Sequence, residues 1–221
     1  HKGEVIGLAG LLGSGRTETA EMMFGLKEVT GGSLKINGKD EKLSNPMAAM
    51  KEKIAFCPED RKLSGIIGDL TVRENIILAL QAMDGMFTHI PYSKQVELAD
   101  KFIDKLRIKV SDRDQLIKNL SGGNQQKVII ARWLATQPRF LILDEPTRGI
   151  DVGTKTEIQK MAVELAKNEG MSVAFISSEM DEMVRTCSKL VVMRDRKKVA
   201  ELTGDQISSE GVMEAIAGGE K

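Results

Sequence analysis

The sequence has few cysteines, no net charge and no long apolar run, and each of these absences argues against a class of protein. Its two cysteines, Cys57 and Cys187, lie far apart and have no metal-ligand spacing, which excludes a disulfide scaffold. Its formal net charge is zero, so there is no electrostatic case for nucleic acid as the main partner. No apolar run reaches the ~20 residues of a membrane helix, and no signal peptide is visible. We therefore expect a cytosolic protein that contacts a membrane only through a partner.

What the sequence does contain is an alternation of short apolar runs and helical patterns. Of its 221 residues, 41% are hydrophobic and 29% are charged, which suits one domain with a substantial core. Alternating strands and helices are typical of an α/β fold with a mostly parallel sheet flanked by helices. We expect strands over residues 5–9, 34–36, 54–57, 140–143, 173–177 and 190–193.

Two further parts of the chain have a distinct local pattern. Residues 71 to 137 are predominantly helical in pattern, and Thr71 and Glu74 have the spacing of a capping box at a helix start. The stretch 85–92, which contains Pro91, separates this helix from the next. Towards the end, residues 189–193 and 198–202 predict a hairpin, and residues 207–217 predict a short helix.

The first chemical motif is a glycine-rich loop near the start. It lies between an apolar run and a helical pattern, which is the order of a P-loop, although a simple tight turn is the alternative. The motif comprises Gly10, Leu11, Leu12, Gly13, Ser14, Gly15, Arg16 and Thr17. Its backbone N–H groups can surround phosphates, and Thr17 can offer a hydroxyl to Mg²⁺. Arg16 replaces the usual lysine, and its longer, forked guanidinium cannot occupy the same compact position.

An acid pair follows the apolar run 140–143. This run shows no polar alternation, which predicts a strand that is buried on both faces. Asp144 and Glu145 would then lie at the end of the strand, beside the loops. In P-loop enzymes the acid at this position helps to hold Mg²⁺, and a neighbouring acid can orient or deprotonate water. The alternative is that Asp144, Glu145 and Pro146 only open a turn.

The segment 120–127, Leu-Ser-Gly-Gly-Asn-Gln-Gln-Lys, is called here the signature segment. Ser121 can cap a helix, and Gly122 and Gly123 allow backbone N–H groups to approach an anion at the positive end of the helix dipole. An ordinary capped helix is the alternative. With two other phosphate motifs in the right order, we interpret the segment as a binder of a γ-phosphate.

Together these motifs resemble the C-terminal half of the fused ATP-binding subunits of bacterial ABC importers for monosaccharides such as ribose, galactose and xylose. The resemblance covers nearly the whole chain. It rests on the P-loop, Pro-Glu-Asp-Arg-Lys at 58–62, the signature segment, Asp-Glu-Pro-Thr-Arg-Gly-Ile-Asp-Val-Gly at 144–153, and Ser-Ser-Glu-Met-Asp-Glu at 177–182.

The resemblance implies an ABC-type P-loop NTPase fold with an inserted helical lobe. We expect a core lobe over residues 1–70, the helical lobe over 71–125, and the rest of the core lobe over 126–221. It further implies ATP and Mg²⁺, with the metal held by Thr17 and Asp144, and nucleotide contacts from the P-loop and the signature segment. The signature contacts are Ser121, Gly122, Gly123 and Gln125. The chain starts directly before the P-loop, so we expect the antiparallel strands and adenine-stacking aromatic of the family upstream of His1.

The implied partners are the N-terminal ABC half of the same subunit, membrane permease subunits and, indirectly, a solute-binding protein. The implied location is the cytoplasmic face of the membrane, as a peripheral subunit. Closure of the domain would be relayed to the permease through residues 59–69 and the helical lobe. No nucleic acid is expected.

The departures from the family pattern fall at positions of chemistry. Besides Arg16, the sequence has Ser178 where the family has a histidine that contacts the γ-phosphate, and Glu59 where it has a glutamine near the metal and water. A hydroxyl cannot replace the cationic contact, and Glu59 adds a negative charge. Of the candidate catalytic residues Glu145, Ser178 and Glu59, Glu145 alone should not rescue hydrolysis. We therefore predict a domain with a degenerate site that lends its signature segment to the partner half.

Two alternatives remain open. The chain could be an independently active ABC ATPase, in which case Arg16, Glu59 and Ser178 must all be tolerated. It could also be a non-transport ABC protein. The neutral charge and the lack of a long coiled-coil insertion between the P-loop and the signature segment argue against the second alternative.

Overall fold

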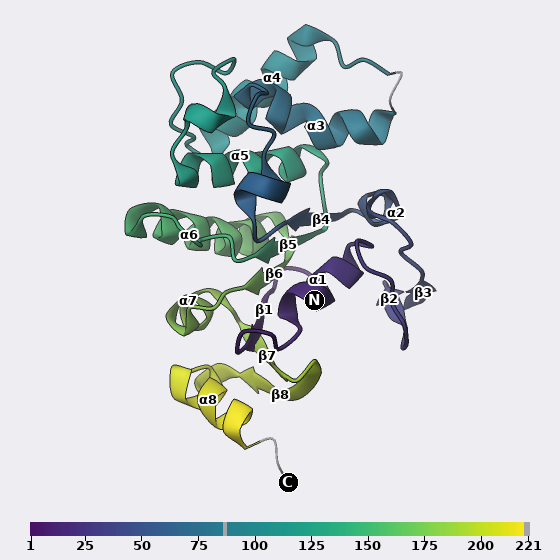
Figure 1. Cartoon of the computed structure of the whole chain (residues 1–221), viewed down its shortest axis with the longest axis vertical. Helices are drawn as coiled ribbons and strands as arrows, with labels where there is room; N and C mark the ends of the chain where they lie inside the picture. The colour runs from purple at the N-terminus through teal and green to yellow at the C-terminus, as the bar shows by residue number, and fades with distance from the viewer. Residues whose placement is uncertain (86–87, 219–221) are drawn as a thin grey trace.

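The main sheet forms the centre of the molecule. The computed structural model describes residues 1–85 and 88–218, and its six-stranded sheet has the order β4-β5-β6-β1-β7-β8 (Figure 1). The strands are β1 (Val5–Gly10), β4 (Ile54–Cys57), β5 (Phe140–Asp144), β6 (Ser172–Ile176), β7 (Lys189–Arg194) and β8 (Lys197–Thr203). Neighbouring strands are parallel except β7 and β8, which form the expected antiparallel hairpin. The predicted α/β class with a mostly parallel sheet is confirmed.

Helices connect the parallel strands, as parallel pairing requires. They are α1 (Arg16–Met23), α2 (Pro46–Lys51), α3 (Val72–Asp84), α4 (Tyr92–Lys105), α5 (Gly122–Ala135), α6 (Val152–Glu169), α7 (Met180–Thr186) and α8 (Ser209–Ala217). The last of these confirms the predicted C-terminal helix, with a start two residues later than expected. Within residues 1–85 and 88–218, no helix is both long and apolar enough to cross a bilayer.

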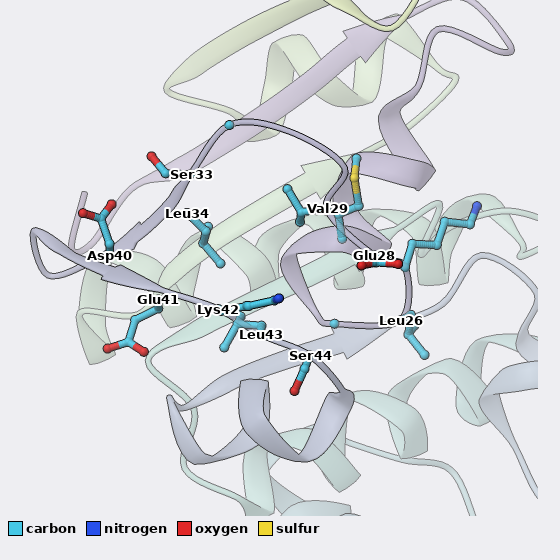
Figure 2. Close-up of a pocket in the computed structure, with 14 residues that line it drawn as sticks. Leu26, Glu28, Val29, Ser33, Leu34, Asp40, Glu41, Lys42, Leu43 and Ser44 are labelled. Atoms are coloured by element: carbon cyan, nitrogen blue, oxygen red, sulfur yellow. The ribbon is translucent and has the colours of Figure 1, made fainter.

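One predicted strand lies outside the main sheet. β2 (Leu34–Ile36) pairs with β3 (Lys39–Glu41) in a separate, two-stranded antiparallel sheet, so its inclusion among the alternating strands of the parallel sheet was wrong. The turn between them is Asn37-Gly38, and both residues have positive φ, 52° and 81°. Asn-Gly is a strong signal for a two-residue hairpin turn, which the apolar pattern alone did not reveal. The hairpin borders a cavity of about 570 Å³ that Leu34, Leu43 and Val29 help to line (Figure 2).

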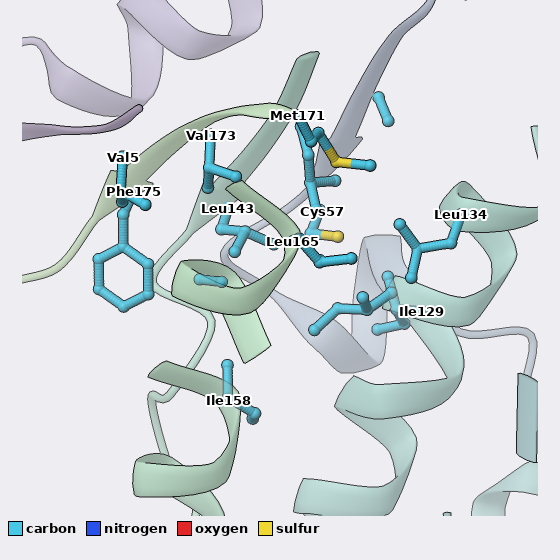
Figure 3. Packing of buried hydrophobic residues seen from close by; sticks show 14 of the residues in the cluster. Val5, Cys57, Ile129, Leu134, Leu143, Ile158, Leu165, Met171, Val173 and Phe175 are labelled. Carbon is cyan, nitrogen blue, oxygen red and sulfur yellow. The ribbon is translucent and has the colours of Figure 1, made fainter. Parts of the chain in front are cut away.

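Both faces of the main sheet are buried by hydrophobic clusters. Side chains alternate along a strand, so Leu141 and Leu143 of β5 enter one cluster and Ile142 enters the other. Figure 3 shows the larger cluster, to which the strands contribute Val5, Cys57, Leu143, Val173 and Phe175 and helices α5 and α6 contribute Ile129, Leu134, Ile158 and Leu165. Ala20 of α1 and Phe24, which directly follows α1, belong to the other cluster, so α1 covers the opposite face. Each large buried side chain contributes ~1.5–3 kcal/mol, which anchors the helices to the sheet.

Helices α3, α4 and α5 lie together at one end of the molecule (Figure 1). The predicted capping box is confirmed: Thr71 Oγ1 accepts from the backbone of Glu74, and Glu74 accepts from the backbone of Thr71 at 2.8 Å. Arg132 of α5 is buried and donates to the carbonyls of Asn75 and Gly65, at 2.7 Å each. Burial lowers the pKa of Arg132 to about 10. This cation therefore joins α5 to α3 and to the segment 61–65.

Candidate functional site

The phosphate loop and the acid pair meet at one edge of the main sheet. The carboxyl ends of β1, β4, β5 and β6 lie there because these strands are parallel, and such an edge is where open α/β sheets bind ligands. The glycine loop between β1 and α1 turns on Gly15, which is the N-cap of α1 with φ 96°. A side chain is strained at this φ, so glycine lets the loop enter the helix with its N–H groups facing the pocket edge.

A pocket of about 160 Å³ brings most of the predicted site residues together. It is lined by Leu12, Gly13, Ser14, Gly15, Arg16, Thr17, Glu18, Glu59, Glu145, Arg148 and Ser178. Gly10 ends β1 and Leu11 is largely exposed beside the loop, so both flank this pocket. The three candidate catalytic residues, which come from three separate segments of the chain, therefore share one pocket with the glycine loop.

The Arg16 side chain turns into the protein. Its Nη1 donates to the carbonyl of Ser177 at 2.7 Å, and its Nη2 lies 3.7 Å from Glu145 Oε1. Arg16 is 7% exposed and Glu145 is 9% exposed, so the ion pair is buried. The other carboxylate oxygen of Glu145 accepts from the Ser178 hydroxyl at 3.1 Å. Glu145 is thus engaged on both oxygens by two of the residues that replace the family's usual chemical groups.

Backbone geometry also fixes Glu145. This residue has φ 47°, a left-handed conformation that is uncommon for a residue with a side chain. Its N–H donates to the carbonyl of Ile176 at 2.9 Å, and its carbonyl accepts from Arg148 at 3.1 Å. Strain of this kind costs ~1–3 kcal/mol and persists only where the surroundings over-determine it. The turn after β5 therefore holds the carboxylate in one position.

Asp144 is the best placed metal ligand of the site. It is fully buried, and neither carboxylate oxygen accepts a hydrogen bond of normal geometry from the described residues. Burial raises the pKa of Asp144 to about 7, and the carboxylates of Glu59 and Glu145 add to this, whereas Thr17 and Arg16 oppose it. An orphaned buried carboxylate beside a threonine hydroxyl fits Mg²⁺, which takes one or two protein oxygens and completes its shell with phosphate and water.

A cation that sequence reasoning did not single out also lines the pocket. Arg148 forms an ion pair with Glu59, the residue that adds negative charge near the metal position. Arg148 lies within the 144–153 motif, so its proximity to the acid pair was visible in the sequence. The pairing of Arg148 with Glu59 could not be predicted from the sequence, because it depends on how the turn after β5 faces the turn after β4.

The signature segment lies apart from this pocket. Ser121 is exposed and is the N-cap of α5, but its hydroxyl makes no capping bond and instead accepts from the Asn124 side chain at 2.9 Å. The expectation of a Ser121 side-chain cap was wrong, because Asn124 competes for that oxygen. The Gln125 side chain is buried and bonds within the chain, to Leu120 and Arg61.

Larger cavities lie elsewhere. The cavity beside the β2–β3 hairpin contains none of the predicted site residues (Figure 2). A cavity of about 530 Å³ lies between α1, the turn after β4, and α5, and Thr17, Glu59 and Asp144 reach its wall. Among the described residues, no group of three or more His, Cys, Asp or Glu side chains could hold a metal alone. A metal held at Thr17 and Asp144 would take its other ligands from water or phosphate.

Comparisons with known proteins agree with this geometry. The family model described as ABC transporter matches residues 1–148. The chain is 51% identical over 218 residues to a fructose import ATP-binding protein of Bifidobacterium longum (strain NCC 2705), covering 98% of the chain and 42% of that protein. It is 52% identical over 215 residues to a galactofuranose transporter ATP-binding protein of Escherichia coli (strain K12), covering 97% and 43%. The chain spans less than half the length of these curated relatives.

Solved structures of ABC transporter cassettes have a similar fold. A nucleotide-free ATP-binding cassette from an ABC transporter superposes with a TM-score of 0.82 at 23% identity, covering 98% of this chain and 85% of that chain. A dimeric cassette in a post-hydrolysis state gives a TM-score of 0.77 at 21% identity, covering 92% and 86%. At these identities the likeness shows the fold.

Proposed function

Since the chain belongs to the ABC transporter family, we propose that it is the C-terminal ATP-binding half of a fused subunit of a monosaccharide importer. In this proposal its own hydrolytic site is degenerate, and it lends the signature segment to the ATP site of the partner half. The single observation that carries the proposal is the buried contact of Arg16 with Glu145. In the proposal this pair engages the Glu145 carboxylate, which is the candidate base, and keeps the Arg16 guanidinium from reaching the phosphates.

The sugar class rests on the relatives. The similar proteins include a fructose importer subunit, a galactofuranose transporter subunit and, at 45% identity, a ribose/galactose/methyl galactoside import protein of Agrobacterium fabrum (strain C58 / ATCC 33970). The chain covers 42–44% of their lengths, which suits one of two similar halves. We propose that the cargo is a sugar. The permease and the solute-binding protein would determine which sugar is carried.

The nucleotide would be held by the glycine loop in this domain's own pocket. Backbone N–H groups of residues 10–17 bind and orient the phosphates, and Thr17 and Asp144 hold Mg²⁺ between them. Bound Mg²⁺ neutralises charge on the phosphate oxygens. Glu145 cannot accept a proton from water readily while Arg16 and Ser178 engage both of its oxygens. Ser178 and Glu59 supply no cation to the γ-phosphate. We therefore expect the pocket to bind nucleotide but to hydrolyse it slowly.

The signature segment carries the second role. In ABC dimers each ATP lies between the P-loop of one domain and the signature of the other. Ser121 is exposed, and the backbone at Gly122 and Gly123 starts the 14-residue helix α5, whose positive end favours an anion. None of the substitutions at Arg16, Glu59 and Ser178 touches this end. A domain with a poor site of its own can thus still complete the site of its partner.

The remaining partners are proposed from the family. The permease would contact the segment 59–69 and the helical lobe, and the 530 Å³ cavity beside this segment suits an inserted permease helix. A solute-binding protein would act indirectly, and the domain would sit peripherally on the cytoplasmic face of the membrane. An active ATPase is the alternative function, and a non-transport ABC protein is another. Neutral net charge disfavours a role on nucleic acid.

The isolated 221-residue chain tests the proposal against an independent ATPase. We expect weak, Mg²⁺-dependent ATP binding by calorimetry and turnover close to background, because no facing signature completes the pocket. Thr17→Ala should remove the Mg²⁺-dependent part of the binding. Submicromolar affinity, or hydrolysis that rises in proportion to protein concentration, would contradict the proposal and favour the independent enzyme.

A further inference from the structure

A fully buried acid lies behind the pocket, at the end of the 177–182 motif, and no role has been assigned to it above. Glu182 of α7 has 1% of its side chain exposed. Its Oε2 accepts from Thr147 Oγ1 at 2.5 Å and from Ser177 Oγ at 2.9 Å. Its Oε1 accepts no hydrogen bond from the described residues, and Lys155 Nζ lies 3.7 Å away. Burying a carboxylate is costly unless it is paired and hydrogen-bonded, so these two hydroxyl bonds fix the Glu182 carboxylate firmly to their partners.

The two hydroxyls belong to the two turns that surround Glu145. Thr147 is 1% exposed and lies two residues after Glu145, in the turn between β5 and α6. Ser177 follows β6, is fully buried, and also accepts from the N–H of Glu179 at 3.0 Å. One carboxylate oxygen therefore ties the turn after β5 to the turn after β6.

Each of these turns makes a contact that the proposed function uses. The Ser177 carbonyl accepts from Arg16, and the neighbouring Ser178 donates to Glu145. The turn after β5 also lies against the start of α5: a Cβ added at Gly122 would be 3.5 Å from the Gly149 carbonyl oxygen. Glu182 therefore supports the Arg16 contact on one side and the neighbour of the signature segment on the other.

We propose that Glu182 is a positioning residue: it holds the turns 145–150 and 176–179 in one relative position, so that Arg16 and Ser178 meet Glu145. Glu182 does not touch the pocket itself. Its carboxylate accepts two charge-assisted hydrogen bonds, which are about twice as strong as neutral ones. The neutral amide of Glu182→Gln keeps the volume but weakens both bonds, so the two turns separate more often without loss of the core.

The direct test measures the Arg16 guanidinium and the two turns in the 221-residue chain. In ¹⁵N-arginine spectra, with the Arg16 signal assigned by Arg16→Lys, Glu182→Gln should shift or broaden the Nη resonances. Amide hydrogen exchange within 144–151 and 176–180 should become roughly tenfold faster, while exchange in α3 and α4 stays unchanged. A purely structural acid would instead raise exchange evenly or not at all.

Asp181→Asn is the matched control, because it removes a negative charge from the exposed face of the same helix. It should leave the Arg16 signal and both turns as they are. If Glu182→Gln fails to fold, Thr147→Val and Ser177→Ala remove the same two bonds from the other side and should give the same local effects. A folded Glu182→Gln chain with an unchanged Arg16 resonance and unchanged exchange in both turns overturns the proposal.

The consequence for the transporter rests on the proposed function, and the two can fail separately. In the full-length subunit with its permease, Glu182→Gln should lower the ATPase rate several-fold, because the turn beside the start of α5 is loosened. If Ser121→Arg abolishes the ATPase rate and Glu182→Gln leaves it at wild type, the positioning role is wrong and the signature role stands. If neither change has an effect, the proposed function is wrong.

Discussion

At the scale of single residues, Asp144 combines a cost to the fold with a use in the site. Its carboxyl is fully buried, and its pKa is raised to about 7 from 3.8 because burial disfavours the charged form. The folded state therefore holds a proton on Asp144 that the unfolded state releases. Stability then falls as the pH rises from about 4 to about 7, which is the reverse of an ordinary paired carboxylate.

Asp144→Asn should therefore stabilise the chain more at high pH than at low pH. Without Mg²⁺ or nucleotide, the gain in the free energy of unfolding should be larger at pH 8 than at pH 5 by about 3 kcal/mol, since about two pH units, at about 1.4 kcal/mol each, separate pH 5 from the folded pKa. Urea unfolding at both pH values, in the presence of a chelator, measures this gain. Asp205→Asn, at an exposed position, is the control. A gain that is the same at both pH values would refute a raised pKa at Asp144.

Arg16→Lys addresses the other unusual residue of the pocket. The change should not create a second hydrolytic site in the assembled subunit, because Ser178 and Glu59 still leave the γ-phosphate and water poorly held. We expect phosphate release to stay at the wild-type rate, whereas a restored second site of comparable rate would about double it. Arg185→Lys, on the exposed side of α7, serves as the control. A second site of comparable rate would show that Ser178 is sufficient.

The residue scale shows what could and could not be predicted from the sequence. The pairing of the glycine loop with Glu145 followed from the strand and loop pattern, whereas Glu59 and Ser178 were singled out through the resemblance to the family. The partners of Arg16 did not, because the Ser177 carbonyl lies 161 positions away in the sequence. The same holds for Glu182, whose burial and contacts appear only when α7 packs against the turns.

At the scale of elements, the start of α5 packs very closely against the first turn of α6. A Cβ added at Gly123 would lie 2.4 Å from Thr154 Cγ2 and 2.9 Å from Thr154 Cβ, well inside contact distance. Helix α6 begins at Val152, so Gly123 lets the start of α5 sit directly against the first turn of α6. The signature segment is thus placed by helix packing as well as by its own loop.

Gly123→Ala should destabilise the chain by ~1–3 kcal/mol, the range for an overpacked contact. Thr154→Ser removes Cγ2 but keeps a hydroxyl for Asp151, so Gly123→Ala with Thr154→Ser should recover part of the loss. Thermal or urea unfolding of the single and double variants gives the coupling directly. Strictly additive effects would contradict this packing. Because of this close packing, a larger side chain at Gly123 would disturb the fold as well as the signature segment. Ser121 is therefore the better position at which to test the role of that segment.

The elements also differ in how well the sequence predicted them. The capping box at Thr71 and Glu74 is local, so four residues were enough to place a helix start. The buried strand β5 was visible as an unbroken apolar run. The β2–β3 pair was not, because its strands are three residues each and too short for periodicity to separate them from the main sheet.

At the scale of the whole molecule, the candidate nucleotide pocket and the signature segment lie in different places. The pocket gathers at the edge of the main sheet, and the signature segment begins α5 in the group with α3 and α4 (Figure 1). The division into lobes at 1–70, 71–125 and 126–221 stays a prediction. Arg132 links α5 to the segment 61–65, so a change at the proposed permease contact would have a physical route to α5.

The most direct test of the account compares Ser121→Arg with Glu145→Gln in the full-length subunit assembled with its permease. Phosphate release is measured at saturating ATP with matched expression, and Asn168→Arg, at an exposed position of α6 outside the helical lobe, is the control for an added arginine. Ser121→Arg should abolish most ATPase activity, because its bulk lies against the γ-phosphate held by the partner half. Glu145→Gln should change the rate far less, because Arg16 and Ser178 already occupy that carboxylate. An equal collapse in both variants would mean that this pocket hydrolyses ATP itself, and the account would be wrong.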